Sequence, residues 1–276
     1  MNTIALFGAG GKMGIRIGDN LRKGPDEVLA VEIDAGLAAL SARGVVATPR
    51  DEALARADAA ILAVPDSLIG VITPSILDAL RPGALLIILD PAAAYAGEVP
   101  IRDDVTYFIV HPCHPPIFSE EPELEVRKDY FGGVKARQNL VCALMHGPEQ
   151  EYEQGVAIAR RMFAPVMNVY RVTVEQMAIL EPALTETTTA TCLTIIREAM
   201  DEAVRCGVPA DAARAFLLGH LNIELAILFG EVSSPFSDGA LVAIEKAKSQ
   251  LFQPDWKKVF EPHNIRASVE AIVHPS

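Results

Sequence analysis

Two imidazoles stand close together in a proline-rich segment near the middle of the chain. Residues His111–Pro116 read His-Pro-Cys-His-Pro-Pro and directly follow an apolar run. Prolines stiffen the backbone, and a neutral imidazole can serve as a base, a hydrogen-bond donor or a metal ligand near neutral pH. We therefore expect His111, His114 or both to be catalytic. The alternative is that the loop only ends a strand and leaves both histidines exposed.

A second segment that could bind a ligand is rich in glycine and lies near the N-terminus. It follows an apolar run and precedes a helical pattern, with glycines at 8, 11 and 14. Backbone N–H groups at such a helix start bind a pyrophosphate, and glycines let the ligand approach. The residues expected to bind a dinucleotide here are Gly8, Gly10, Gly11, Lys12, Met13 and Gly14.

An acid should follow the second strand of a dinucleotide-binding domain, about 20 residues after the glycines, where it binds the adenosine ribose. Asp34 and Glu32 both fit, and we expect Asp34 to play this role. Its charge would repel a 2′-phosphate, so NAD is favoured over NADP. Asp34 can also cap a helix at that point. The turn at Val64 and Pro65 is expected to line the same cofactor.

Three polar residues in the C-terminal half suggest a metal site. His220 and Glu224 are four residues apart in an apolar helical run and so share one face. Together with Glu186 from the preceding long helix they would ligate a divalent cation, and Mg, Mn, Zn or Ca are the candidates. The alternative is that the side chains of His220 and Glu224 pair with each other inside the protein and bind no metal.

These residues need a scaffold, and the first half of the chain predicts one. Short apolar runs alternate with helical patterns, as in parallel βαβ units. Runs without polar alternation indicate strands buried on both faces. The expected strands are Ile4–Phe7, Val28–Ile33, Ala59–Val64, Leu85–Leu89, Tyr107–Val110, Asn139–Met145 and Val166–Tyr170. The fold class is therefore α/β, a Rossmann-type doubly wound parallel sheet over residues 1–172.

Residues 173–276 predict an all-α domain for substrate binding and dimerisation. One long helix is expected over Val174–Cys206, followed by helices over Ala210–Phe229 and Gly239–Leu251. Apolar side chains lie on all sides of the long helix. One small domain cannot bury that much apolar surface. A homodimer that buries helix faces is therefore expected.

Composition restricts the partners and the compartment. The 276 residues carry a formal net charge of −12, which repels nucleic acid and anionic membranes. No apolar stretch approaches the ~20 residues of a membrane span. The four cysteines are widely spaced, as expected in a reducing compartment. These features favour a cytoplasmic protein that acts on a small molecule.

The glycine loop, the Val64-Pro65-Asp66 turn and the long helix resemble those of the 6-phosphogluconate/β-hydroxyacid dehydrogenase superfamily over nearly the whole chain. The glycine loop and His111-Pro112 are also similar to those of prephenate dehydrogenases. One departure stands out, since Pro182 and Glu186 occupy the positions of the lysine and asparagine of β-hydroxyacid dehydrogenases. Within the superfamily, the His111–Pro116 loop resembles that of a sugar-acid oxidoisomerase.

That resemblance implies an NAD-linked oxidation of the 2-hydroxyl of a branched sugar acid, coupled to a metal-assisted α-ketol rearrangement. His111 or His114 would then be the base, with Glu186 also at the reaction centre. The first alternative is a simple NAD-dependent hydroxyacid dehydrogenase without a metal. A nucleotide-sensing regulatory protein is a second, and a thioester-forming dehydrogenase that uses Cys113 as nucleophile is a third.

Overall fold

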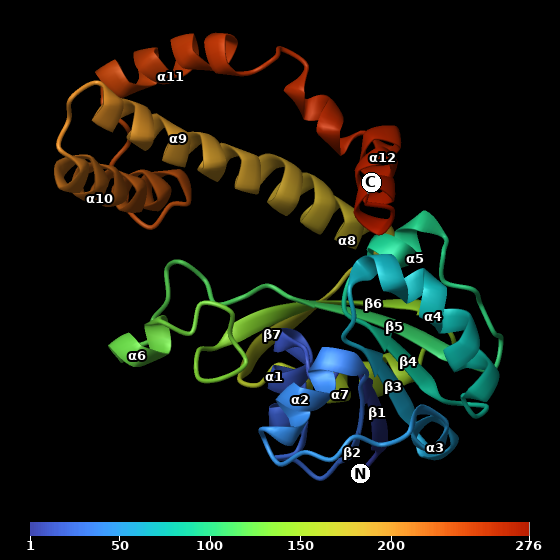
Figure 1. Cartoon of the computed structure of the whole chain (residues 1–276). Helices are drawn as coiled ribbons and strands as arrows, with labels where there is room; N and C mark the ends of the chain where they lie inside the picture. The colour runs from blue at the N-terminus through green and yellow to red at the C-terminus, as the bar shows by residue number, and fades with distance from the viewer. Residues whose placement is uncertain (276) are drawn as a thin grey trace. The chain divides into compact units, whose positions relative to one another are not determined.

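A seven-stranded sheet forms the centre of the N-terminal half of this computed structural model, which describes residues 1–275. The strand order is β2-β1-β3-β4-β5-β6-β7. Every pair of neighbouring strands is parallel except β5 with β6. The strands in Figure 1 are β1 (Thr3–Phe7), β2 (Glu27–Val31), β3 (Ala59–Leu62), β4 (Leu85–Ile88), β5 (Thr106–Pro112), β6 (Gln138–His146) and β7 (Val166–Arg171).

Helices connect these strands in the order expected of a doubly wound sheet. α1 and α7 pack against each other, as do α4 and α5. The helices of this half are α1 (Lys12–Leu21), α2 (Asp34–Ser41), α3 (Arg50–Arg56), α4 (Asp66–Ala79), α5 (Ala92–Ala96), α6 (Leu124–Arg127), α7 (Glu151–Met162) and α8 (Val174–Ala178). The predicted α/β fold class is confirmed, but β6 and β7 run opposite to β1–β5, so the sheet is not parallel throughout.

The strands lie where the apolar runs predict because both faces of the sheet are covered. Every residue of β3 and β4 is buried. Parallel strands in such a sheet need apolar side chains at every position. The core that results holds the carboxyl ends of β1, β4 and β5 in fixed register, and the candidate site residues follow those ends.

The chain divides into two compact units. The first comprises Met1–Leu180 and the segment from Arg266 onward, and the second comprises Glu181–Ile265. The division expected after residue 172 did not assign this C-terminal segment to the first unit, because α12 (Pro262–Val273) was not predicted. Its later part belongs to the first unit, where Val269 is fully buried and the Arg266 guanidinium lies over the Tyr95 ring.

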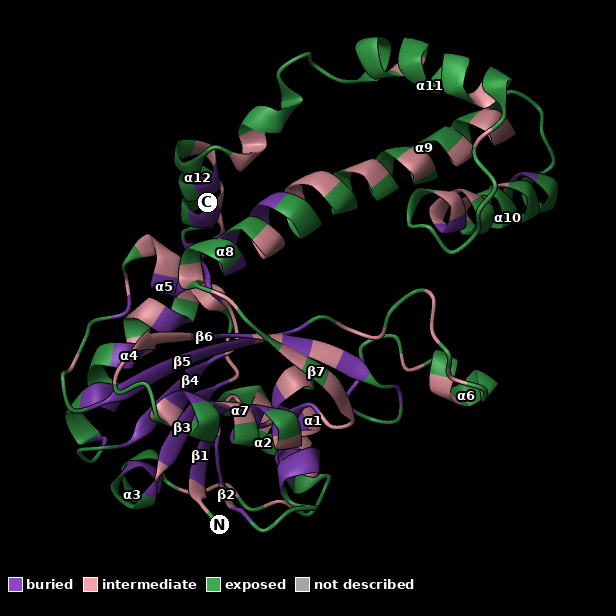
Figure 2. Ribbon diagram, turned by 180° about the vertical axis from the view of Figure 1, so that it is seen from behind, coloured by how far each residue is buried: buried purple, intermediate pink, exposed green. Residues whose placement is uncertain are grey.

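The second unit is helical. It contains the π-helix η1 (Ile179–Ala190, from its third residue), α9 (Thr191–Arg205), α10 (Ala210–Leu228), α11 (Asp238–Leu251) and the 3₁₀-helix η2 (Trp256–Phe260). Most of α9, α10 and α11 is exposed or half-buried (Figure 2). No helix of residues 1–275 is both long enough and apolar enough to span a membrane.

The π-helix interrupts the single long helix predicted over Val174–Cys206. In a π-helix the backbone bonds run from residue i to i+5, and such segments are often found at functional sites. Thr188 and Thr189 match this geometry, since their hydroxyls donate to the carbonyls of Ala183 and Leu184, five residues earlier. Competition from these threonine hydroxyls, together with Pro182, explains why the helix leaves the α geometry here.

Candidate active site

The glycine loop adopts a conformation that only glycine permits at two points. Gly8 has a φ of +69°, and a Cβ atom there would lie 2.2 Å from the carbonyl oxygen of Ala63. A Cβ on Gly14 would lie 2.0 Å from the carbonyl oxygen of Gly8. The loop therefore passes close to the end of β3 and turns directly into α1.

A cavity of about 860 Å³ opens beside this loop. Five of the predicted cofactor-binding residues line it: Gly8, Gly10, Gly11, Val64 and Pro65. The exposed Lys12, the half-buried Met13 and the buried Gly14 do not line it. Gly14 instead lets the loop close against itself.

The acid at this cavity is Glu32 rather than Asp34. Glu32 follows β2 and lines the cavity, and its Oε2 accepts a hydrogen bond of 2.6 Å from the N–H of Gly10. Asp34 is exposed, has a φ of 47° and begins α2 outside the cavity lining. The strand ends three residues before Asp34, so Glu32 is the carboxylate that the backbone aims at the glycine loop. We therefore replace Asp34 by Glu32 as the ribose-binding candidate.

The two histidines of the proline-rich loop lie next to each other. Their ring centroids are 6.3 Å apart and their planes nearly perpendicular. Nδ1 of His111 lies 3.0 Å from the carbonyl oxygen of Leu89, and Nδ1 of His114 lies 3.0 Å from that of Phe131. Because a carbonyl only accepts, both Nδ1 atoms carry the proton, and Nε2 is the acceptor nitrogen of each neutral ring.

His114 is held in an unusual backbone conformation. Its φ is 60°, which a non-glycine residue rarely adopts and which is found most often at functional sites. Phe131 supports it through its carbonyl and through an edge-to-face ring contact at 6.0 Å. The Arg16 guanidinium covers the Phe131 ring at 4.7 Å, and Asp129 Oδ2 accepts three backbone N–H groups of the same turn.

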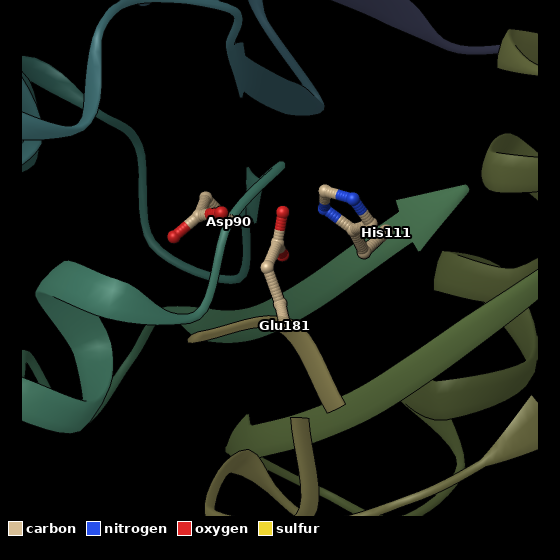
Figure 3. Close-up of side chains that lie close together, drawn as sticks. All are labelled: Asp90, His111 and Glu181. Atoms are coloured by element: carbon tan, nitrogen blue, oxygen red, sulfur yellow. The ribbon is translucent and has the colours of Figure 1, made fainter. Parts of the chain in front are cut away.

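His111 also belongs to a cluster with two carboxylates. Asp90, His111 and Glu181 each offer a ligand atom, and these atoms all lie within 4.8 Å of one another (Figure 3). Asp90 follows β4, and Glu181 comes directly after Leu180 in the π-helix η1. Sequence reasoning missed Asp90 and Glu181. The available signals were an acid at the end of a parallel strand and an acid immediately before Pro182.

Comparison with known proteins places the chain in a family. Residues 119–273 match the family described as phosphogluconate dehydrogenase (decarboxylating), C-terminal. The chain is 52% identical over 274 residues to the D-apionate oxidoisomerase of Rhizobium rhizogenes, covering 99% of this chain and 100% of that protein. The D-apionate oxidoisomerase of Cupriavidus necator is 49% identical, with 98% of each chain covered. The chain belongs to the D-apionate oxidoisomerase family.

A solved structure agrees with this assignment. It is described as a semialdehyde dehydrogenase NAD-binding protein from Cupriavidus necator in complex with calcium and NAD, and it is 49% identical to this chain. The TM-score is 0.96, and 99% of each chain is covered. The resemblance to the 6-phosphogluconate dehydrogenase-like superfamily is thereby confirmed, and D-apionate oxidoisomerases are the relatives within it.

The chemistry available to this member of the D-apionate oxidoisomerase family follows from its electrostatics. Burial lowers the pKa of His111, an effect that outweighs the opposing influence of Asp90. The imidazole is therefore neutral at neutral pH. Burial also raises the pKa of the Cys113 thiol, so this cysteine is a poor thiolate nucleophile.

The predicted metal ligands of the second unit do not form a group in the single chain. His220 is exposed, stacks on Phe216 at 4.0 Å, and its Nδ1 lies 2.8 Å from the Phe216 carbonyl oxygen. Glu224 is half-buried on the same helix, and Glu186 is exposed on η1. Within residues 1–275, the group of three side chains placed to share a cation is Asp90, His111 and Glu181 instead. Helical spacing puts His220 and Glu224 on one face of α10, but it carries no information on where Glu186 lies.

Proposed function

We propose that this protein oxidises the 2-hydroxyl of a branched sugar acid, D-apionate or a close analogue, with NAD, and couples that oxidation to an α-ketol rearrangement. The observation that carries the proposal is the full-length match to D-apionate oxidoisomerases at 52% and 49% identity. The geometry supports it, because His111 lies near the carboxyl end of β5 and His114 just beyond it, where doubly wound sheets bind their ligands.

NAD would bind in the cavity beside the glycine loop, and when bound it supplies the hydride acceptor. Glu32 would accept hydrogen bonds from the adenosine ribose hydroxyls after releasing the Gly10 N–H. A 2′-phosphate at the same point would meet a carboxylate, and this repulsion selects NAD over NADP. The start of α1 would receive the pyrophosphate.

His114 is the better placed of the two histidines to accept the hydroxyl proton. Phe131 holds its Nδ1–H, so Nε2 is the basic nitrogen. His111 lies instead against the carboxylates of Asp90 and Glu181. In the oxidation, the 2-hydroxyl proton passes to His114 Nε2 as the C2 hydrogen leaves with its electron pair.

The rearrangement is an isomerisation and needs no further oxidant. The tertiary hydroxyl next to the new ketone loses its proton and becomes a carbonyl. One carbon substituent migrates with its bonding electrons to the former carbonyl carbon, whose oxygen then gains a proton. A Lewis acid assists such a step by polarising the ketone and acidifying the hydroxyl.

Two measurements test this function. Purified protein with D-apionate and NAD should form NADH, and NMR of the product should show the rearranged carbon skeleton. An unrearranged 2-oxo acid would support the alternative of a simple hydroxyacid dehydrogenase. NAD binding without turnover across a panel of sugar acids would support a nucleotide sensor and contradict the proposal.

The second unit supports the expectation of a homodimer. Within this unit α9 and α10 border a groove of about 540 Å³, lined by apolar side chains together with His220 and Glu224. Phe216, Leu228 and Phe229 are at least 65% exposed, and such apolar surface favours association. Light scattering coupled to size exclusion should give twice the chain mass, and a monomer at all concentrations would contradict the dimer. A cytoplasmic location stays a prediction.

A further inference from the structure

Two of the three clustered side chains are held rigidly by neighbouring strands. β4 and β5 pair in register from Leu85 with Thr106 to Ile88 with Ile109. Continuing that register places Asp90 beside His111. Asp90 lies two residues beyond the end of β4, whereas His111 is still paired with Val141 of β6, and both side chains are half-buried.

Hydrogen bonds behind these two side chains orient them. His111 Nδ1 donates to the Leu89 carbonyl oxygen at 3.0 Å, and Asp90 Oδ1 accepts from the N–H of Ala92 at 2.7 Å. Histidine ligands of metals commonly donate their second ring N–H to a backbone carbonyl, which fixes the tautomer and the ring orientation. The Leu89 bond is of this kind, and it makes Nε2 the ring nitrogen that would ligate a cation.

We propose that Asp90, His111 and Glu181 together bind one divalent cation of the Mn²⁺ or Zn²⁺ type. Two carboxylates and one neutral imidazole carry a charge of −2, which such a cation balances. Mixed nitrogen and oxygen ligands suit Mn²⁺ and Zn²⁺, whereas Ca²⁺ prefers six to eight oxygen ligands. The role of the cation in the rearrangement rests on the proposed function, but its binding does not.

The π-helix gives this site a special feature. Glu181 is the third residue of η1, and Pro182 follows it. Proline supplies no N–H to the helix, and π geometry shifts the register of every later side chain relative to an α-helix. A carboxylate at the start of this segment is therefore set by the irregular backbone, and sequence periodicity does not predict its direction.

Binding of Mn²⁺ to the full-length protein, without NAD or substrate, tests the site. Electron paramagnetic resonance of free Mn²⁺ should show one tight site per chain. Asp90→Asn and Glu181→Gln should weaken that site at least about tenfold, since even residues that only support metal ligands typically contribute 10- to 100-fold. Asp103→Asn and Glu123→Gln, two exposed acids outside the cluster, are the matched controls and should bind like the parent.

Nitrogen hyperfine coupling in the bound Mn²⁺ spectrum tests the histidine directly, and His111→Gln should abolish it. Circular dichroism of each variant establishes that it is folded. Loss of the site in His220→Gln or Glu224→Gln, with Asp90→Asn binding normally, would overturn the proposal in favour of the second unit. Equal binding by all variants would also overturn it. Product NMR decides the proposed function separately, because the Mn²⁺ titration contains no substrate.

Discussion

The first unit, which contains the sheet, and the helical second unit differ in how they hold their polar side chains. We call them the sheet unit and the helical unit. In the sheet unit, Glu32, Asp90 and His111 each follow or end a buried strand, and each is held by a backbone hydrogen bond. In the helical unit, α9 and α11 contain no buried residue, and His220 is exposed on α10. The residue types are similar, but in the sheet unit neighbouring strands bring Asp90 and His111 together, and the turn after β2 brings Glu32 to the glycine loop.

This difference shows what a strand edge contributes that helical spacing does not. Neighbouring parallel strands end at the same edge, so side chains far apart in sequence meet there. Two residues four apart on a helix share a face, but nothing on that helix determines what they face. Helix spacing alone therefore could not establish that Glu186 approaches His220 and Glu224.

The largest effect should come from the histidine that is proposed to take the proton. His114→Ala should lower kcat by about 100- to 10,000-fold, the usual contribution of a general base. NADH formation from D-apionate measures kcat, and fluorescence titration measures NAD affinity, which should be unchanged. An activity within twofold of the parent would remove His114 from the proton transfer.

The next effect contrasts the cores of the two units. Ile61 in β3 is fully buried, whereas Ile223 in α10 is 44% exposed. Ile61→Ala should lower the free energy of unfolding by about 2–5 kcal/mol. Ile223→Ala should change it by less than about 0.5 kcal/mol if that surface is in water. Urea unfolding of both variants measures the difference.

Protein concentration sharpens this contrast. Should Ile223 lie in a dimer interface, Ile223→Ala would lower stability more at low protein concentration than at high concentration. Ile61→Ala should lower it equally at both. If both variants lost equal and large amounts of unfolding free energy at all protein concentrations, Ile223 would be as well packed as Ile61 within the single chain, and the contrast between the units would be wrong.

Much of the sheet unit can be predicted from the sequence because its strands are buried on both faces. Continuous apolar runs such as those of β3 and β4 leave little ambiguity. The positions of Gly8, Gly11 and His111 then follow from strand ends. The reversed direction of β6 and β7 could not be predicted, since the apolar pattern of a strand is the same in either direction.

The rest of the site depends on local backbone geometry that the hydrophobic periodicity of the sequence does not predict. Glu32 and Asp34 are two residues apart, and only the point at which β2 ends decides which one reaches the glycine loop. Glu181 is the third residue of the π-helix η1, whose backbone does not follow the α-helical period on which the sequence prediction rests. The first difference is two residues, from Asp34 to Glu32, and the second is five, from Glu186 to Glu181.

A smaller effect is expected at the cofactor cavity. Glu32→Gln should weaken NAD binding by about 10-fold or more, because a hydrogen bond to a charged group is worth about 1.5–3 kcal/mol. It should weaken NADP binding much less, since the repulsion is gone. Asp34→Asn is the matched control and should leave both affinities nearly unchanged. Michaelis constants for the two cofactors give the comparison, and the reverse pattern would restore Asp34 as the ribose ligand.

The smallest effect is expected at Cys113, which lies between the two histidines in sequence. Burial raises the pKa of its thiol, so thiolate is scarce at neutral pH, and a thioester mechanism has no activated nucleophile. Cys113→Ser should therefore keep kcat within about twofold, a change that corresponds to less than about 0.5 kcal/mol. Alkylation by iodoacetamide should accelerate as the pH rises and should show no plateau below the usual thiol pKa. Complete loss of activity in Cys113→Ser, with rapid alkylation at neutral pH, would instead make the thiol the nucleophile and transfer the role proposed for His114 to activation of that thiol.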